Sequence, residues 1–103
     1  MGEWKTIEPD TWKPENVGDQ ISGVYISKVE GDEKTSARYY LDTANKPIMV
    51  WGSAIIDDRM QYVKIGERVR LTFLGKEKNL KGQPLKLFKV EKMFDETVEV
   101  KFL

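Results

Sequence analysis

Residues 47–74 read PIMVWGSAIIDDRMQYVKIGERVRLTFL, a strand pattern, a helix pattern and a second strand pattern in direct succession. Apolar side chains alternate in 47–53 and again in 67–74, with the period of two that half-buried strands show. Residues 54–63 instead repeat apolar side chains at helical spacing, and Ser53 is a favourable N-cap. The sequence therefore predicts one short helix inserted between two strands.

The same alternation continues on both sides of this stretch. It covers 21–29, 36–43 and 84–94, and 97–102 alternates again as a candidate sixth strand at an edge. Gly23 interrupts the first of these segments, and a glycine inside a strand pattern predicts a bulge. The chain is therefore predicted to be all-β, with three strands, a short helix and two strands in order.

Matching the apolar faces of these segments predicts which side chains are buried. The predicted core consists of Ile21, Val24, Ile26, Tyr39, Leu41, Ile48, Val50, Ile56, Met60, Val63, Val69, Leu71, Phe73, Phe88 and Val90. A bulge at Gly23 would turn Tyr25 outward, and Thr72 is also expected to face out. The outer faces of 36–43 and 47–53 are expected to carry Arg38, Tyr40, Met49 and Trp51. A register slip of one residue in 47–53 would instead bury Trp51 and expose Val50.

The composition excludes several classes of function. The 103 residues include no cysteine and no histidine, which removes disulfides, thiolate and histidine-based catalysis and the usual transition-metal ligands. No apolar run approaches the ~20 residues of a membrane span, and no signal peptide is expected. Asp57 and Asp58 are neighbours on the predicted helix, so their side chains diverge by about 100° and form no close dyad. We therefore expect a binding module without a cofactor or metal, and not an enzyme.

The charges balance at 17 against 17 but are unevenly distributed. Residues 1–63 carry 7 basic and 11 acidic side chains, whereas 64–92 carry 9 basic and 3 acidic ones. A total of zero argues against indiscriminate binding of polyanions, but a local basic segment permits a directed anion site. A merely solvated strand face is the simpler alternative.

Five strands with a helix between the third and the fourth is the order of the oligonucleotide/oligosaccharide-binding (OB) barrel. An SH3-like barrel, the structural competitor, lacks that helix. We expect a five- to six-stranded OB-fold barrel in 17–94 and an edge strand or tail in 95–103. An N-terminal arm, 1–16, is expected to pack on the barrel through Trp4 and Trp12, because exposed tryptophans are unfavourable.

Short motifs distributed over 12–92 carry a resemblance to a known family. They are Trp12-Lys13-Pro14-Glu15 with Gly18-Asp19 and Ile21-x-Gly23, then Val50-Trp51-Gly52-Ser53-Ala54, then Val63-x-Ile65-Gly66-x-Arg68-Val69, and finally Gly75-Lys76 with Gly82 and Lys86-x-Phe88-x-Val90. In this order they resemble the phage-type OB-fold single-stranded-DNA-binding proteins and archaeal replication-protein-A-like domains. The resemblance implies an intracellular role in replication or recombination, in the cytoplasm or nucleoid, or in the host cytoplasm for a viral protein. It also implies replication proteins as candidate partners.

Binding a single strand without sequence preference requires a basic groove for phosphates and flat aromatic side chains for bases. In OB barrels this groove crosses the second and third strands, between the first-to-second and fourth-to-fifth loops. Bases are expected to stack on Tyr40 and Trp51, and phosphates to meet the basic side chains. The candidate nucleic-acid-binding residues are Tyr25, Arg38, Tyr40, Met49, Trp51, Arg70, Lys76, Lys78, Lys81 and Lys86.

Other interpretations of the same residues stay open. Single-stranded RNA is an alternative ligand, because stacking does not distinguish the sugar. The exposed aromatic side chains could instead form a homodimer or partner contact in an assembly module. A carbohydrate-binding barrel would also use Tyr40 and Trp51 but has no use for a lysine-rich loop. Arg70 could simply pair with Glu67 or Asp42.

Overall fold

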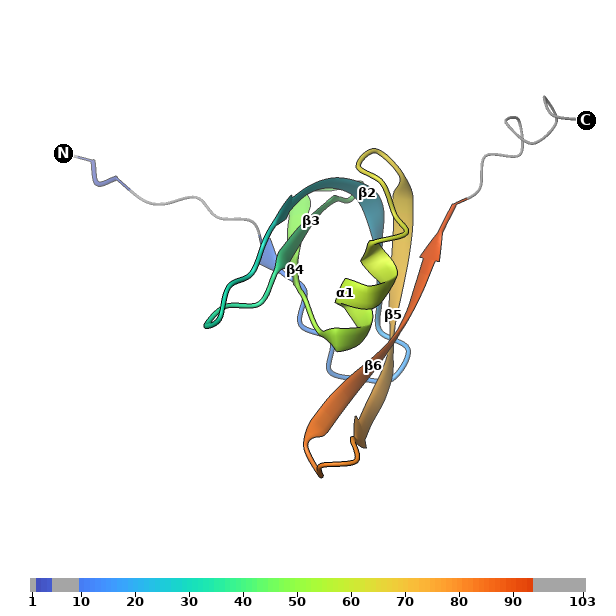
Figure 1. Cartoon of the computed structure of the whole chain (residues 1–103). Helices are drawn as coiled ribbons and strands as arrows, with labels where there is room; N and C mark the ends of the chain where they lie inside the picture. The colour runs from blue at the N-terminus through green and yellow to red at the C-terminus, as the bar shows by residue number, and fades with distance from the viewer. Residues whose placement is uncertain (1, 5–9, 94–103) are drawn as a thin grey trace, which may run out of the picture.

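The computed structural model describes residues 2–4 and 10–93 (Figure 1). The strands of this part are β1 (Asp10–Thr11), β2 (Gln20–Val29), β3 (Arg38–Asp42), β4 (Pro47–Trp51), β5 (Arg68–Lys78) and β6 (Pro84–Lys92), and its helix is α1 (Ala54–Met60). The prediction of an all-β fold is confirmed, and α1 lies between β4 and β5 as the sequence predicts. The candidate strand 97–102 lies outside the described residues.

Within the described residues the six strands form one mixed sheet in the order β1-β4-β3-β2-β5-β6. β1 runs parallel to β4, and the other neighbours are antiparallel. In this part of the chain β4 and β6 are not hydrogen-bonded to each other, so the prediction of a closed barrel is wrong. Figure 1 shows the curled sheet with α1 lying across its opening.

The N-terminal arm explains why the sheet stays open. β1 pairs with the edge of β4 that a closing strand would need, with Asp10 opposite Ile48. The Trp12 backbone N–H then donates to the Met49 carbonyl at 2.8 Å, and the Trp12 ring lies 5.9 Å from that of Phe88 on β6. Side-chain packing therefore bridges β4 and β6 where backbone hydrogen bonds do not.

The core lies between the concave face of the sheet and α1. Its buried apolar side chains are Ile21, Tyr25, Ala37, Tyr39, Leu41, Val50, Ile56, Met60, Val63, Val69, Leu71, Phe73 and Phe88. The predicted alternation is confirmed in β3 and β4 and holds in β5 with one exception. Thr72 was predicted to face out but is buried, and it accepts a hydrogen bond from Gln20 Nε2 at 3.1 Å.

The prediction for β2 is wrong after Gly23. The strand continues in register through this glycine, whose missing side chain makes room for the backbone of β3: a Cβ there would lie 2.7 Å from the Asp42 carbonyl oxygen. The register shift instead lies between Tyr25 and Ser27. Because the alternation is unbroken at Gly23, Tyr25 faces the core at 5% exposure, while Ile26 faces out at 41%.

The β5–β6 hairpin reaches well past the rest of the described fold (Figure 1). β5 continues to Lys78 instead of ending near residue 74, so the connecting turn is shorter than the predicted loop 75–83. The extension passes through a register shift between Phe73 and Gly75, where Gly75 has a φ of 116°. Glycine adopts this left-handed conformation without the penalty of a side chain, which allows the strand to bulge and continue.

The helix and the arm show smaller differences from prediction. The Ser53 hydroxyl caps α1 by accepting from the Ile56 N–H at 3.4 Å, but the helix ends at Met60, three residues before the predicted 63. No helix in the described residues is long and apolar enough to cross a membrane. Trp12 packs against the core as predicted, whereas Trp4 is fully exposed, so the prediction that Trp4 anchors the arm is wrong.

Candidate nucleic-acid interface

Four of the predicted site side chains share the outer face of β3 and β4. Arg38 pairs with Trp51, and Tyr40 pairs with Met49, across the antiparallel ladder. Residues directly opposite in such a ladder are nearest neighbours on one face of the sheet. Trp51 is 44% exposed and the other three are half-buried. We call these four residues the platform; the slipped register is excluded because Val50 is buried.

Arg38 is a cation beside Trp51, and the Asp32 carboxylate is close enough to interact with its charge. Arg38 forms no ion pair with any residue of 2–4 or 10–93, and within the same residues its Nε is shielded from solvent without a hydrogen-bond partner. A buried donor left unsatisfied costs roughly 1–3 kcal/mol, so each such group calls for an explanation. A guanidinium held in this way is suited to an anion that approaches the platform.

Trp51 also lines a cleft of about 310 Å³ between β4 and β6, which we call the β4–β6 cleft. Its lining residues are Trp12, Lys13, Pro14, Val50, Trp51, Gly52, Ser53, Ile56, Lys86 and Phe88. The described residues that line it thus include three aromatic side chains and two lysines, but no carboxylate. The platform and the cleft share Trp51 and are therefore continuous.

A carboxylate beside this cleft, that of Asp57, takes part in the packing of the fold. Asp57 on α1 lies behind Gly52 and accepts a hydrogen bond of 2.7 Å from the Tyr39 hydroxyl. Burial, together with this hydrogen bond, raises the pKa of Tyr39 well above its ordinary value, so Tyr39 remains a neutral donor. The Asp57 carboxylate is thus held against β3 by a neutral donor.

The predicted lysines of the hairpin gather on one face. Lys76 lies opposite Lys86, and Lys78 lies opposite Pro84, whereas Lys81 belongs to the turn. All four lysines are exposed, and none forms an ion pair with another described residue. Because Lys86 also lines the β4–β6 cleft, the lysine face of the hairpin continues from the cleft outward.

Two predicted site residues are not part of this surface. The Tyr25 ring lies in the core, 6.0 Å from that of Tyr39, and burial raises the pKa of its hydroxyl. Tyr25 therefore has no face free for stacking, and its prediction as a site residue is wrong. Arg70 instead donates two hydrogen bonds, of 3.0 and 3.1 Å, to Glu91, rather than pairing with Glu67 or Asp42.

Arg70 belongs to a second cleft, on the outer face of β5 and β6. This cleft of about 240 Å³, which we call the outer cleft, is lined by Ser22, Arg68, Val69, Arg70, Glu91, Lys92 and Met93. The Glu91 carboxylate raises the pKa of Arg70, and the Arg70 hydrogen bonds lower the pKa of Glu91. Lys92 in turn pairs with Glu67 at 3.3 Å. Most of the positive charge here is compensated within the fold.

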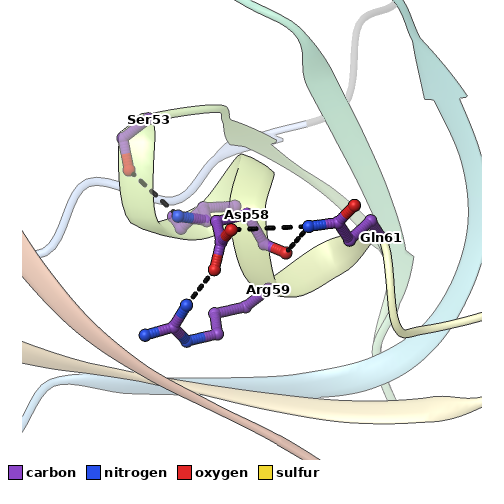
Figure 2. Close-up of polar contacts among 5 residues, drawn as sticks. Ser53, Asp58, Arg59 and Gln61 are labelled. Carbon is purple, nitrogen blue, oxygen red and sulfur yellow. Dashed lines mark hydrogen bonds and ion pairs between the residues drawn. The ribbon is translucent and has the colours of Figure 1, made fainter.

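The two adjacent aspartates of α1 have separate structural roles. Asp57 bonds to Tyr39, whereas Asp58 forms an ion pair with Arg59 and accepts from Gln61 Nε2 at 3.4 Å. Figure 2 shows these contacts of Asp58 together with the Ser53 cap. In the described part of the chain no three acidic, histidine or cysteine side chains come together as a metal site.

Sequence reasoning missed the contribution of the arm to the cleft. Trp12 was predicted as a packing anchor and Phe88 as a core residue, and Lys13 was cited only as part of a motif and not as a site residue. Their meeting with Trp51 depends on the two-residue strand β1, which is too short to carry a periodic signal. No family model, curated protein or solved structure matches this chain. The platform, the cleft and the lysine face are thus the features on which a function can rest.

Proposed function

We propose that this chain is an OB-fold protein that binds single-stranded DNA without strong sequence preference. The order of β2 to β6, with α1 between the third and fourth of these strands, agrees with the OB order. In this proposal the N-terminal arm opens the barrel between its third and fifth strands, β4 and β6. The platform then lies on the second and third strands, where OB folds bind oligonucleotides.

The observation that carries the proposal is the pairing of Arg38 with Trp51 and of Tyr40 with Met49 on the outer face. Bases would stack on Trp51 and Tyr40, each stack contributing ~1–3 kcal/mol. Phosphates would meet Arg38 and the lysine face of the hairpin. The mechanism is passive and non-catalytic: the bound strand is protected from re-pairing, or presented to replication or recombination proteins inside the cell.

The test is a fluorescence-anisotropy titration of labelled oligo-dT, a matched duplex and oligo-U at low and high salt. Neutralising about 3–5 phosphates predicts that log affinity falls with log salt at a slope of about −2 to −3.5. Trp51→Ala should weaken oligo-dT binding by about 5- to 150-fold, which is the loss of one stack. Tyr62→Ala is the matched control, because Tyr62 is an exposed aromatic residue just beyond α1 and outside the platform.

Three outcomes would overturn the proposal: no binding to oligo-dT at low salt, affinity indifferent to salt, or equal losses in Trp51→Ala and Tyr62→Ala. Tighter binding to oligo-U than to oligo-dT would change the ligand to single-stranded RNA, which requires a contact to the 2′-hydroxyl. The duplex should bind more weakly than oligo-dT, since its bases are not available to the platform.

A protein-interaction module is the second candidate, favoured by the zero net charge and by the exposure of Trp51 on a partly apolar face. The two functions differ in what covers this tryptophan. An interface residue loses solvent exposure as the protein concentration rises, whereas a stacking residue loses it only when nucleic acid is added. Tryptophan quenching by acrylamide, measured over both series with Trp51→Phe as reference, separates them.

A further inference from the structure

We infer that the β4–β6 cleft receives a single unstacked nucleobase, with Lys13 and Lys86 holding the phosphates beside it. The inference rests on the proposed function, because a strand crossing the platform reaches the cleft at Trp51. Its ligand is a nucleotide unit within a single strand. The cleft is thus assigned as a subsite, distinct from the stacking surface formed by the outer faces of β3 and β4.

The size of the cleft suits one nucleobase. Pockets for small organic molecules usually span about 300–1,000 Å³, and this cleft of about 310 Å³ lies at the lower limit. A single planar heterocycle fits such a volume. A base that entered the cleft from the platform would leave the stack of its neighbours.

The walls of the cleft are suited to a flat ring. Trp51 forms the border with the platform, and Trp12 and Phe88, tilted by 52° to each other, also line the cleft. Aromatic rings bind every base through its π-face, so these walls do not select a sequence. The Ser53 hydroxyl, which accepts from the Ile56 N–H, can still donate a hydrogen bond to a polar edge of the ring.

The charges of the cleft suit the phosphates on either side of that base. Lys13 and Lys86 are exposed and form no ion pair with another residue of the described chain. The described residues that line the cleft include no carboxylate, and the Asp57 carboxylate behind Gly52 accepts a hydrogen bond from Tyr39. The outer cleft lacks this combination: two of its three basic residues, Arg70 and Lys92, are paired, and the described residues that line it include no aromatic side chain.

Photo-crosslinking tests where the bases lie. Oligo-dT carrying one 5-iodouracil at successive positions is irradiated with the whole protein, and the crosslinked peptides are identified by mass spectrometry. We expect one position to crosslink to Trp12 and a neighbouring position to Trp51. An abasic substitution at the first of these positions should weaken binding at least about threefold. Crosslinks to Trp51 without any to Trp12 would overturn the subsite and leave the proposed function intact.

A matched pair of double variants tests the phosphate contacts. Lys13→Ala with Lys86→Ala removes the two cleft lysines, and Lys78→Ala with Lys81→Ala removes the same charge at the tip of the hairpin. We expect the first pair to weaken oligo-dT binding at least about fivefold more than the second. Equal losses would show that these lysines act only through overall charge and would overturn the subsite. Failure of the parent to bind any oligonucleotide would overturn the proposed function together with it.

Discussion

The two clefts beside β6 both contain basic residues, but their charges are arranged in opposite ways. In the outer cleft Arg70 is bound by Glu91 at 3.0 Å and Lys92 by Glu67 at 3.3 Å. The described residues that line the β4–β6 cleft include Lys86 and three aromatic side chains but no carboxylate. The number of basic residues in a segment therefore does not locate an anion site. Its location depends on which of these residues the fold leaves without an acidic partner.

The same contrast explains the charge pattern of the sequence. The basic segment 64–92 includes only three acidic residues, and two of them, Glu91 and Glu67, pair with Arg70 and Lys92. The third, Glu77, lies opposite Leu85 and thus on the hairpin face away from Lys76. Among the described residues, Lys64, Arg68 and the four lysines of the hairpin form no ion pair, so the lysine face carries the larger part of the uncompensated charge of this segment.

The largest expected effect comes from removing one wall of the β4–β6 cleft. Truncating a fully buried large aromatic side chain costs about 3–5 kcal/mol, and Trp12 is half-buried, so Trp12→Ala should lower the free energy of unfolding by about 2 kcal/mol. Trp51→Ala should change it by less than ~0.5 kcal/mol, because the ring is exposed. Urea denaturation of both variants checks this prediction, and equal losses would mean that Trp12 does not bridge β4 and β6.

The next effect compares the two faces of β6 directly. Lys86→Glu and Lys89→Glu change the net charge equally, but Lys86 lines the β4–β6 cleft and Lys89 lies 3.8 Å from Glu91. A lost charged contact costs about 1.5–3 kcal/mol, so Lys86→Glu should weaken oligo-dT binding by at least about tenfold. Lys89→Glu should weaken it by less than about threefold. Similar anisotropy curves for the two variants would contradict the prediction that the β4–β6 cleft, and not the opposite face of β6, binds the strand.

Acid should lower the stability that the carboxylates of Glu91 and Glu67 contribute to the folded protein. The hydrogen bonds from Arg70 lower the pKa of Glu91 from 4.5, and the backbone N–H of Lys64 is the main cause that lowers the pKa of Glu67. The unfolded chain therefore binds more protons, so this stabilisation is complete above pH 4.5 and is lost as the pH falls through the lowered values. Urea midpoints from pH 7 to pH 3 should fall, and Glu91→Gln should fall less steeply. Parallel curves would show that the pair does not contribute.

The periodic parts of the fold could be predicted from the sequence. β3 and β4 each bury one face, so a period of two placed Tyr39 and Val50 inside and Tyr40 and Trp51 outside. The cap at Ser53 was also predictable, because the bond from its hydroxyl is local. These features depend on residues close in sequence or on a single buried face of a strand. Both can be recognised in the sequence, as a capping residue or as an alternation of apolar and polar side chains.

The remaining features depend on contacts between distant segments. Gly23 was interpreted as the position of a bulge, but its lack of a side chain instead allows the β3 backbone to approach closely. The strand therefore continues without a shift at Gly23, and Tyr25 faces the core instead of solvent. The sheet stays open because two residues of the arm pair in parallel with β4, and two residues are too few to give a periodic sequence pattern. The partner of Arg70 is set by the register of β5 and β6. A single sequence does not specify such registers where both faces carry polar residues.

The smallest expected effect on oligo-dT binding is that of Arg70→Ala, because Arg70 belongs to the outer cleft. Arg70→Ala removes a positive charge from the basic segment but also frees Glu91, so oligo-dT affinity should stay within about twofold of the parent. Its free energy of unfolding at pH 7 should fall only slightly, by less than ~1 kcal/mol, because exposed ion pairs contribute little. Lys86→Ala should instead make the plot of log affinity against log salt less steep by ~0.7, the contribution of one phosphate on a single strand. If Arg70→Ala flattened that plot as much as Lys86→Ala, the outer cleft would also hold the strand, and the path of the nucleic acid would have to cross β5.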